Sequence, residues 1–294
     1  MKRSLFILLM VMFCLGQLNA QKAPKGFSFV PQGIASVNGE LIKVDAFFMG
    51  QTEVTNGEYR AFLQDLAKTG DNSMLSKCMP DSSLWLSAFA YGFNAPFVDV
   101  YHWHPAYKDY PVVNITADAA VAFCDWLTKK WNKEVASEKH LKGVYRLPIE
   151  PEWVRAARGD HHQWIYAWGD PKGKQNDDKF LRNKKGEFQC NFLSNSKEFK
   201  AIDTVYVKKG EKKNDVVLDN YVVAGPVKSY SANLFGLYCM CGNVSEMLNG
   251  GGVAKGGSFN TSAYSLRIDT PAESFSKPSP FVGFRVVFIP DPVN

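Results

Sequence analysis

Helical periodicity is confined to the first 160 of the 294 residues of this chain. Three segments there carry apolar residues at helical spacing, whereas residues 71–115 are aromatic and irregular. Beyond residue 160, short β-prone runs alternate with Gly and Asn turns, and no linker or internal repeat is evident. The pattern predicts a single α+β domain with little regular secondary structure. It favours this class over a helix bundle and excludes a coiled coil, a collagenous chain and a polytopic membrane protein.

The ends of the three helices are marked by local signals. Thr55 and Glu58 have the spacing of a capping box, in which each side chain satisfies a backbone amide of the first turn, and Gly70 predicts the end of that helix. A second helix is predicted to begin near Thr116, and a third is predicted with Pro151 in its first turn.

The N-terminus has the pattern of a signal peptide. Lys2 and Arg3 precede an apolar run, Leu5–Leu15, and Ala20 ends a plausible cleavage site. The run is too short to span a bilayer, which takes about 20 residues. We therefore expect residues 1–20 to be removed and the mature chain, residues 21–294, to be exported without a transmembrane segment. Its expected location is the periplasm, the outer membrane or the extracellular space.

Five cysteines remain in the mature chain. An odd number leaves at least one thiol unpaired within the molecule, even in an oxidising compartment. We interpret them mainly as small buried hydrophobic residues, and the sequence leaves their pairing open. They are Cys78, Cys124, Cys190, Cys239 and Cys241.

The charge distribution argues against a nucleic-acid partner. The net charge is only +5, and in the lysine-rich residues 171–215 acidic residues are interspersed. We interpret that segment as a solvated insertion.

Local motifs reveal no catalytic group. His102 and His104 could lie on one side of an extended segment, with Tyr107 or Asp109 completing a metal site, but two histidines in an aromatic stretch are more often structural. The sequence around Ser245 is not that of a nucleophile elbow.

Nine short segments, in order, nevertheless resemble the sulfatase-modifying-factor family, that of the formylglycine-generating enzymes. The resemblance implies an elaborated C-type-lectin-like single domain with few regular elements over residues 21–294. The segments are Thr52–Tyr59, Tyr110–Val113, Ala120–Trp126, Arg146–Gly159, Tyr166–Asp170, Asn233–Tyr238, Gly242–Glu246, Lys255–Phe259 and Val282–Arg285.

The resemblance also implies where the family's copper site falls. Family enzymes bind Cu(I) through two cysteines that follow a Gly-Gly-Ser motif, and thiolates are the soft ligands that this ion prefers. In this chain those positions are Thr261 and Leu266, and no cysteine follows Cys241. We therefore expect neither copper nor formylglycine chemistry.

Two family calcium sites are implied as well, since Ca²⁺ takes hard oxygen ligands. The first is expected at Asn191, Phe192, Asp219 and Tyr221. The second is expected at Gly242, Val244 and Glu246, although Cys239 stands where the family has an Asn. The alternative for both acidic residues is that they cap turns.

The enzymes' active-site groove is expected to keep Ser258, Thr261, Tyr264 and Arg267. Hydroxyls, a ring and a guanidinium can hold an extended peptide without chemistry, or these residues can simply fill space. The expected function is that of a non-catalytic, exported binding or structural protein of the cell envelope, similar to members in gliding-motility and protein-secretion machines. Its partner would be a protein or a glycan. The alternative is a metal-dependent oxidase acting on a protein cysteine through His102, His104 or the remaining cysteines.

Overall fold

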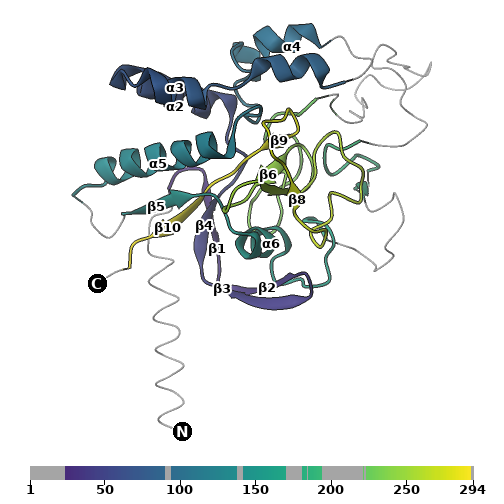
Figure 1. The fold of residues 1–294 in the computed structure, drawn as a ribbon. Helices are drawn as coiled ribbons and strands as arrows, with labels where there is room; N and C mark the ends of the chain where they lie inside the picture. The colour runs from purple at the N-terminus through teal and green to yellow at the C-terminus, as the bar shows by residue number, and fades with distance from the viewer. Residues whose placement is uncertain are drawn as a thin grey trace.

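The computed structural model describes residues 24–89, 94–137, 142–169, 181–183, 185–193, 221 and 223–292. The predicted signal peptide and Asp219 lie outside these residues. Figure 1 shows how the described elements are arranged.

A four-stranded antiparallel sheet joins the two ends of the domain. Its strands, in spatial order, are β1 (Phe27–Val30), β4 (Phe47–Gly50), β10 (Val287–Pro290) and β5 (Gly143–Arg146). Because the last strand pairs between β4 and β5, the C-terminal segment completes the sheet that the N-terminal segment begins.

A hairpin, β2 (Gly33–Val37) and β3 (Glu40–Val44), lies beside this sheet. Its two-residue turn is Asn38-Gly39, with φ of +50° and +86°. Asn and Gly are the residues that tolerate left-handed backbone in such turns.

A second four-stranded sheet includes parts of three of the nine segments named above, Gly242–Glu246, Lys255–Phe259 and Val282–Arg285. Its spatial order is β8 (Glu273–Ser274), β7 (Val253–Lys255), β6 (Ser245–Met247) and β9 (Val282–Gly283). β6 and β9 are parallel, which sets Glu246 opposite Gly283.

The structure confirms the three predicted helices. They are α2 (Asn56–Thr69), with Thr55 and Glu58 forming the capping box and Gly70 the C-cap, α5 (Ala117–Glu134), with Thr116 as its N-cap, and α6 (Glu150–Arg158). In Figure 1, α5 lies along β5 and β10 with α2 and α3 beyond it, while α6 lies next to the β2–β3 hairpin. Among the described residues, no helix is both long and apolar enough to cross a membrane.

The expectation that residues 71–115 are irregular is wrong. This segment contains α3 (Asn72–Cys78), α4 (Ala95–Val100) and two 3₁₀ helices, η1 (Ser82–Ser87) and η2 (Pro105–Tyr107). Elements of three to seven residues are too short to display a helical stripe. The side chains of Asp71, Asp81 and His104 cap three of them.

The core consists of three groups of buried side chains. One surrounds Trp153 of α6, a second packs Phe62, Phe123 and Phe284 between α2, α5 and the first sheet, and a third surrounds Trp85. The five cysteines of the described residues are buried and free of disulfides.

Candidate functional site

An ion pair lies in the interior where the two family motifs of the second sheet meet. Glu246 of β6 and Arg285, just after β9, are at most 1% exposed. The Arg285 Nε and Nη2 atoms lie 2.7 and 2.5 Å from the two carboxylate oxygens, and the Trp153 indole N–H donates to Oε2 at 2.7 Å. Buried charges need several such hydrogen bonds to offset the free-energy cost of removing them from water. Both oxygens of Glu246 thus accept hydrogen bonds, and the carboxylate is half of a buried ion pair, whereas its expected role as a calcium ligand stays a prediction.

The other residues expected at the second calcium site form a tight turn. Gly242 has φ of +80°, and a Cβ there would lie 2.4 Å from the Asn191 carbonyl oxygen. Val244 is fully buried in the apolar group around Trp85. Cys239 has its thiol 3.7 Å from the Val227 carbonyl oxygen. The calcium site expected here would use backbone carbonyls of this turn, and it stays a prediction.

Asn191 belongs to the first expected calcium site, which stays a prediction. Its side chain is fully buried, and its amide group donates to the Val223 carbonyl at 2.8 Å. Its Oδ1 atom is buried without a partner in the described part of the chain. A buried acceptor without a donor is costly, and a cation would satisfy it. Phe192 is buried beside it, and Tyr221 is half-buried. Asp219, the expected carboxylate ligand, lies outside the described residues.

The two copper positions carry side chains that are fully used by the fold. The Thr261 hydroxyl accepts a hydrogen bond from the Ser258 amide at 2.7 Å and donates to the Ser258 carbonyl at 3.0 Å. Ser258 is fully buried, and its hydroxyl accepts from the Asn260 amide at 3.3 Å. Leu266 is fully buried in the apolar group around Trp153. These residues close a turn and fill the core, and they do not fit a copper ion.

The outer pair of the expected groove is differently placed. Tyr264 is 64% exposed. Arg267 makes a bidentate ion pair with Asp269, with Nε–Oδ1 and Nη2–Oδ2 distances of 2.9 and 2.7 Å. Of the four expected groove residues, these two reach the surface, whereas Ser258 and Thr261 turn into their own loop. None of the four lines either of the two cavities described below.

The histidines considered for a metal site have separate structural roles. His102 is buried between two asparagines, with Nδ1 3.3 Å from Asn56 Oδ1 and Nε2 3.5 Å from Asn114 Nδ2. Burial lowers the pKa of His102 to about 3. His104 accepts from the Ala106 amide at 3.2 Å and so caps η2. Across the described residues, no three His, Cys, Asp or Glu side chains are grouped to hold a metal.

The cysteines are held as neutral thiols. Burial raises the pKa of Cys241 to about 12 and raises the pKa of Cys190 and Cys239 well above its usual range. Because the thiolate is the nucleophile and the metal ligand, these cysteines are poor candidates for redox chemistry.

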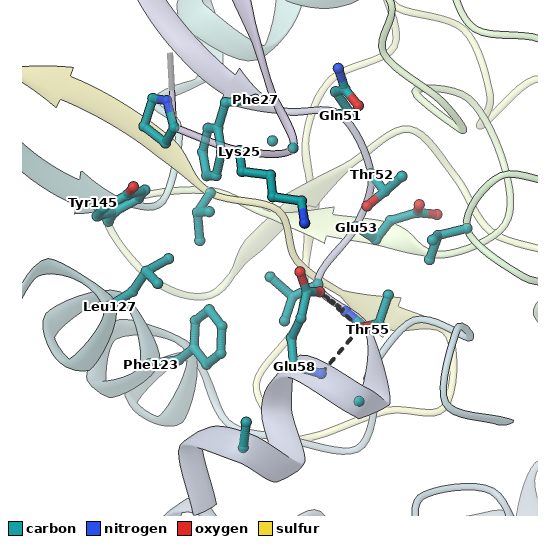
Figure 2. Close-up of a pocket in the computed structure, with 18 of the residues that line it drawn as sticks. Lys25, Phe27, Gln51, Thr52, Glu53, Thr55, Glu58, Phe123, Leu127 and Tyr145 are labelled. Atoms are coloured by element: carbon teal, nitrogen blue, oxygen red, sulfur yellow. Dashed lines mark hydrogen bonds between the residues drawn. The ribbon is translucent and has the colours of Figure 1, made fainter. Parts of the chain in front are cut away.

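A cavity of about 1030 Å³ lies elsewhere, between α2, α5 and the first sheet. This volume is at the upper end of the range typical of ligand sites. Figure 2 shows Phe123, Leu127 and Tyr145 on one side of it and Glu53 and Thr55 on the other. The lining is mostly apolar. The sequence did not indicate this cavity, because its walls come from segments far apart in the chain.

Glu53 is the unusual polar group of this cavity. It is fully buried, and its Oε1 accepts a hydrogen bond from Asn243 Nδ2 at 2.9 Å. Its Oε2 has no partner in the described part of the chain. Burial raises the pKa of Glu53 to about 8, with Glu246 adding to the rise and Arg285 opposing it. Only its position in the segment Thr52–Tyr59 could have drawn attention to it, and nothing local indicates its burial.

Comparison with protein families gives one match over most of the chain. Residues 17–289 match the model described as "Sulfatase-modifying factor enzyme 1-like domain".

Three related proteins show how far this similarity extends. The chain is 22% identical to the formylglycine-generating enzyme of Thermomonospora curvata over 271 residues, covering 80% of this chain and 74% of that enzyme. It is 25% identical to the formylglycine-generating enzyme of Bos taurus over 222 residues, covering 70% of this chain but only 49% of that enzyme. It is 29% identical to the inactive Cα-formylglycine-generating enzyme 2 of Bos taurus over 139 residues, covering 47% of this chain and 32% of that protein.

Among solved structures, the crystal structure of CarF is similar, with a TM-score of 0.57 and 22% identity. The match covers 91% of this chain and 99% of that one. This likeness concerns the fold and confirms the predicted α+β architecture.

Proposed function

The chain belongs to the sulfatase-modifying factor enzyme 1-like domain family, and on that premise we propose that it is a non-catalytic binding protein exported to the cell envelope. The observation that carries the proposal is the state of the two copper positions. The Thr261 hydroxyl is hydrogen-bonded within its own turn, and the apolar side chain of Leu266 is fully buried. A small rotation of either side chain would therefore not provide a copper ligand. The relative named as inactive supports a non-catalytic branch of this family.

The cavity between α2 and α5 supports a polypeptide partner over a glycan. Glycans present many hydroxyls, whereas most of the exposed surface of this cavity is apolar and includes Phe27, Phe123 and Leu127. An apolar side chain of a partner protein would displace water from these surfaces, which is favourable. Lys25 extends into the same space and can pair with an acidic group of that partner (Figure 2). A role in gliding-motility or secretion machinery is the cellular setting that we propose for this interaction.

The test is a cross-linking experiment in intact envelopes with two matched variants of α2. Ala61 lines the cavity, whereas Ala67 is exposed on the same helix and does not line it. Both changes to Arg keep a good helix former, so stability should be little affected. We expect Ala61→Arg to abolish the specific cross-link and Ala67→Arg to preserve it. Equal cross-linking by the two variants would exclude the cavity as the binding surface.

The surface formed by Tyr264 and Arg267 is the competing location. Tyr264→Ala and Arg267→Ala remove exposed or partly exposed side chains, so folding should be little changed. Loss of the cross-link in these variants, with Ala61→Arg still binding, would move the partner to the predicted groove.

Metal analysis distinguishes this proposal from the oxidase alternative. Purified protein is expected to contain no stoichiometric copper or iron and to consume no oxygen with a cysteine peptide. Stoichiometric copper or iron together with oxygen consumption would overturn the binding function. Fractionation that leaves the chain in the cytoplasm would contradict export.

A further inference from the structure

A second, smaller cavity lies between the β2–β3 hairpin, α6 and β7, and it shares no lining residue with the large cavity. Its volume is about 230 Å³, below the range of about 300–1,000 Å³ typical of sites for larger metabolites. A small ion or a single functional group fits this space better. The charged residues that line it are Glu150, Arg158, Lys255 and Asp269.

Two buried cations line this cavity. Arg158, at the end of α6, is 6% exposed, and Lys255, at the end of β7, is 5% exposed. The Lys255 ammonium donates to the Thr270 carbonyl and lies 3.2 Å from Glu150 Oε1, so its charge is matched. The Asp269 carboxylate is already held by Arg267.

Arg158 is the cation without a counter-charge. Its Nε is buried with no hydrogen-bond partner, and within the described residues no carboxylate forms an ion pair with it. Burial lowers the pKa of Arg158, with Asp269 opposing the effect from beyond ion-pair distance. A buried guanidinium without a partner is costly to the fold, and a bound anion would remove that cost.

We propose that this cavity binds a small oxyanion through Arg158 and Lys255. The guanidinium presents a planar fork of donors that matches two oxygens of a carboxylate, phosphate or sulfate group. Lys255 is paired with Glu150, and Asp269 is paired with Arg267, which does not line the cavity, so the charge of Arg158 is the one that an anion would match. This site is independent of the partner-binding cavity proposed above.

Calorimetric titration of the full mature chain tests the proposal. Acetate, phosphate and sulfate are each titrated, with chloride at matched ionic strength as the reference. We expect saturable binding of at least one oxyanion and none of chloride, and the arm that binds most tightly identifies the chemistry. Binding should be lost in Arg158→Met.

Two charge variants keep the test decisive if Arg158→Met does not fold. Glu150→Gln removes an acid that competes for Lys255 and should tighten binding by about fivefold, whereas Asn38→Asp adds an acid at the rim and should weaken it by about fivefold. Asp118→Asn is the matched control, since it removes an acid from the first turn of α5 as Glu150→Gln does from α6. Unchanged affinity in both charge variants, or a response to chloride equal to that of the oxyanions, would overturn the site.

Discussion

Glu53 makes folding stability depend on pH. Its pKa is raised from 4.5 to about 8 in the folded chain, so between these values the folded state keeps a proton that the unfolded state has lost. Because the folded state then binds more protons, stability falls as the pH rises through this window, by at most about 1.4 kcal/mol per pH unit. We expect Glu53→Gln, which mimics the protonated acid, to remove this fall. The measurement is denaturant unfolding at several pH values.

His102 acts in the opposite sense and over a lower range. Its pKa falls from 6.5 to about 3 on folding, so stability is lost as the pH drops below about 6.5. The Glu53 contribution is therefore read as the difference between wild type and Glu53→Gln above pH 6.5. Glu40→Gln, at an exposed acid, controls for the lost charge. Parallel curves for wild type and Glu53→Gln would show that Glu53 is ionised in the folded chain.

At the scale of elements, the capping box of α2 is the clearest local determinant. The Thr55 amide donates to Glu58 Oε2 at 2.8 Å, and the Glu58 amide donates to the Thr55 hydroxyl at 3.2 Å. Thr55→Ala leaves the Glu58 amide without its partner and should cost about 1 kcal/mol in the free energy of unfolding. Thr55→Ser keeps the hydroxyl and should cost less. Thermal and urea unfolding of the two variants measure the difference, and equal losses would mean that packing, not the cap, positions α2.

The elements that the sequence predicted and those that it missed differ in length. α2 and α5 span 14 and 18 residues, long enough for an apolar stripe to repeat, and both begin at a threonine cap. α3 and η2 have seven and three residues, and their apolar side chains do not define a face. Their caps are visible in the sequence, but a cap without a stripe is equally typical of a turn.

At the scale of the whole molecule, we predict that calcium stabilises the fold through Asn191 and Asp219. The unpartnered Oδ1 of Asn191 supports this prediction. Calcium that binds only the folded chain should add about 2.7 kcal/mol at a free concentration of about 100 times its dissociation constant. For a domain of this size the melting temperature should rise by a few degrees.

Thermal melting of wild type and Asp219→Ala, with excess calcium and with chelator, tests this prediction. We expect the calcium-dependent rise only in wild type. A wild-type melting temperature that chelator does not change, once the protein is shown to be free of metal, would contradict the prediction. A rise that persists in Asp219→Ala would place the ion at other ligands.

The family, the fold class and the starts of two helices could be predicted from the sequence, because they depend on local interactions or on residue identity alone. The nine ordered segments indicated the family and the α+β fold, and both are confirmed. Thr261 and Leu266 excluded the thiolate pair without any structure, because neither side chain carries sulfur. The helix starts at Thr55 and Thr116 followed from hydrogen bonds that span three residues.

Tertiary structure decided which polar groups are paired and which are not. Glu246 meets Arg285, 39 residues away, and this contact makes its carboxylate half of a buried ion pair. Nothing local in the sequence indicated that Glu53 and Arg158 are buried, yet within the described part of the chain one polar atom of each is left without a partner. Desolvation and the positions of counter-charges depend on how distant segments pack, and no local pattern encodes them. The lack of the thiolate pair at positions 261 and 266 was therefore readable from the sequence, whereas the pairing of buried polar groups was set by the packing.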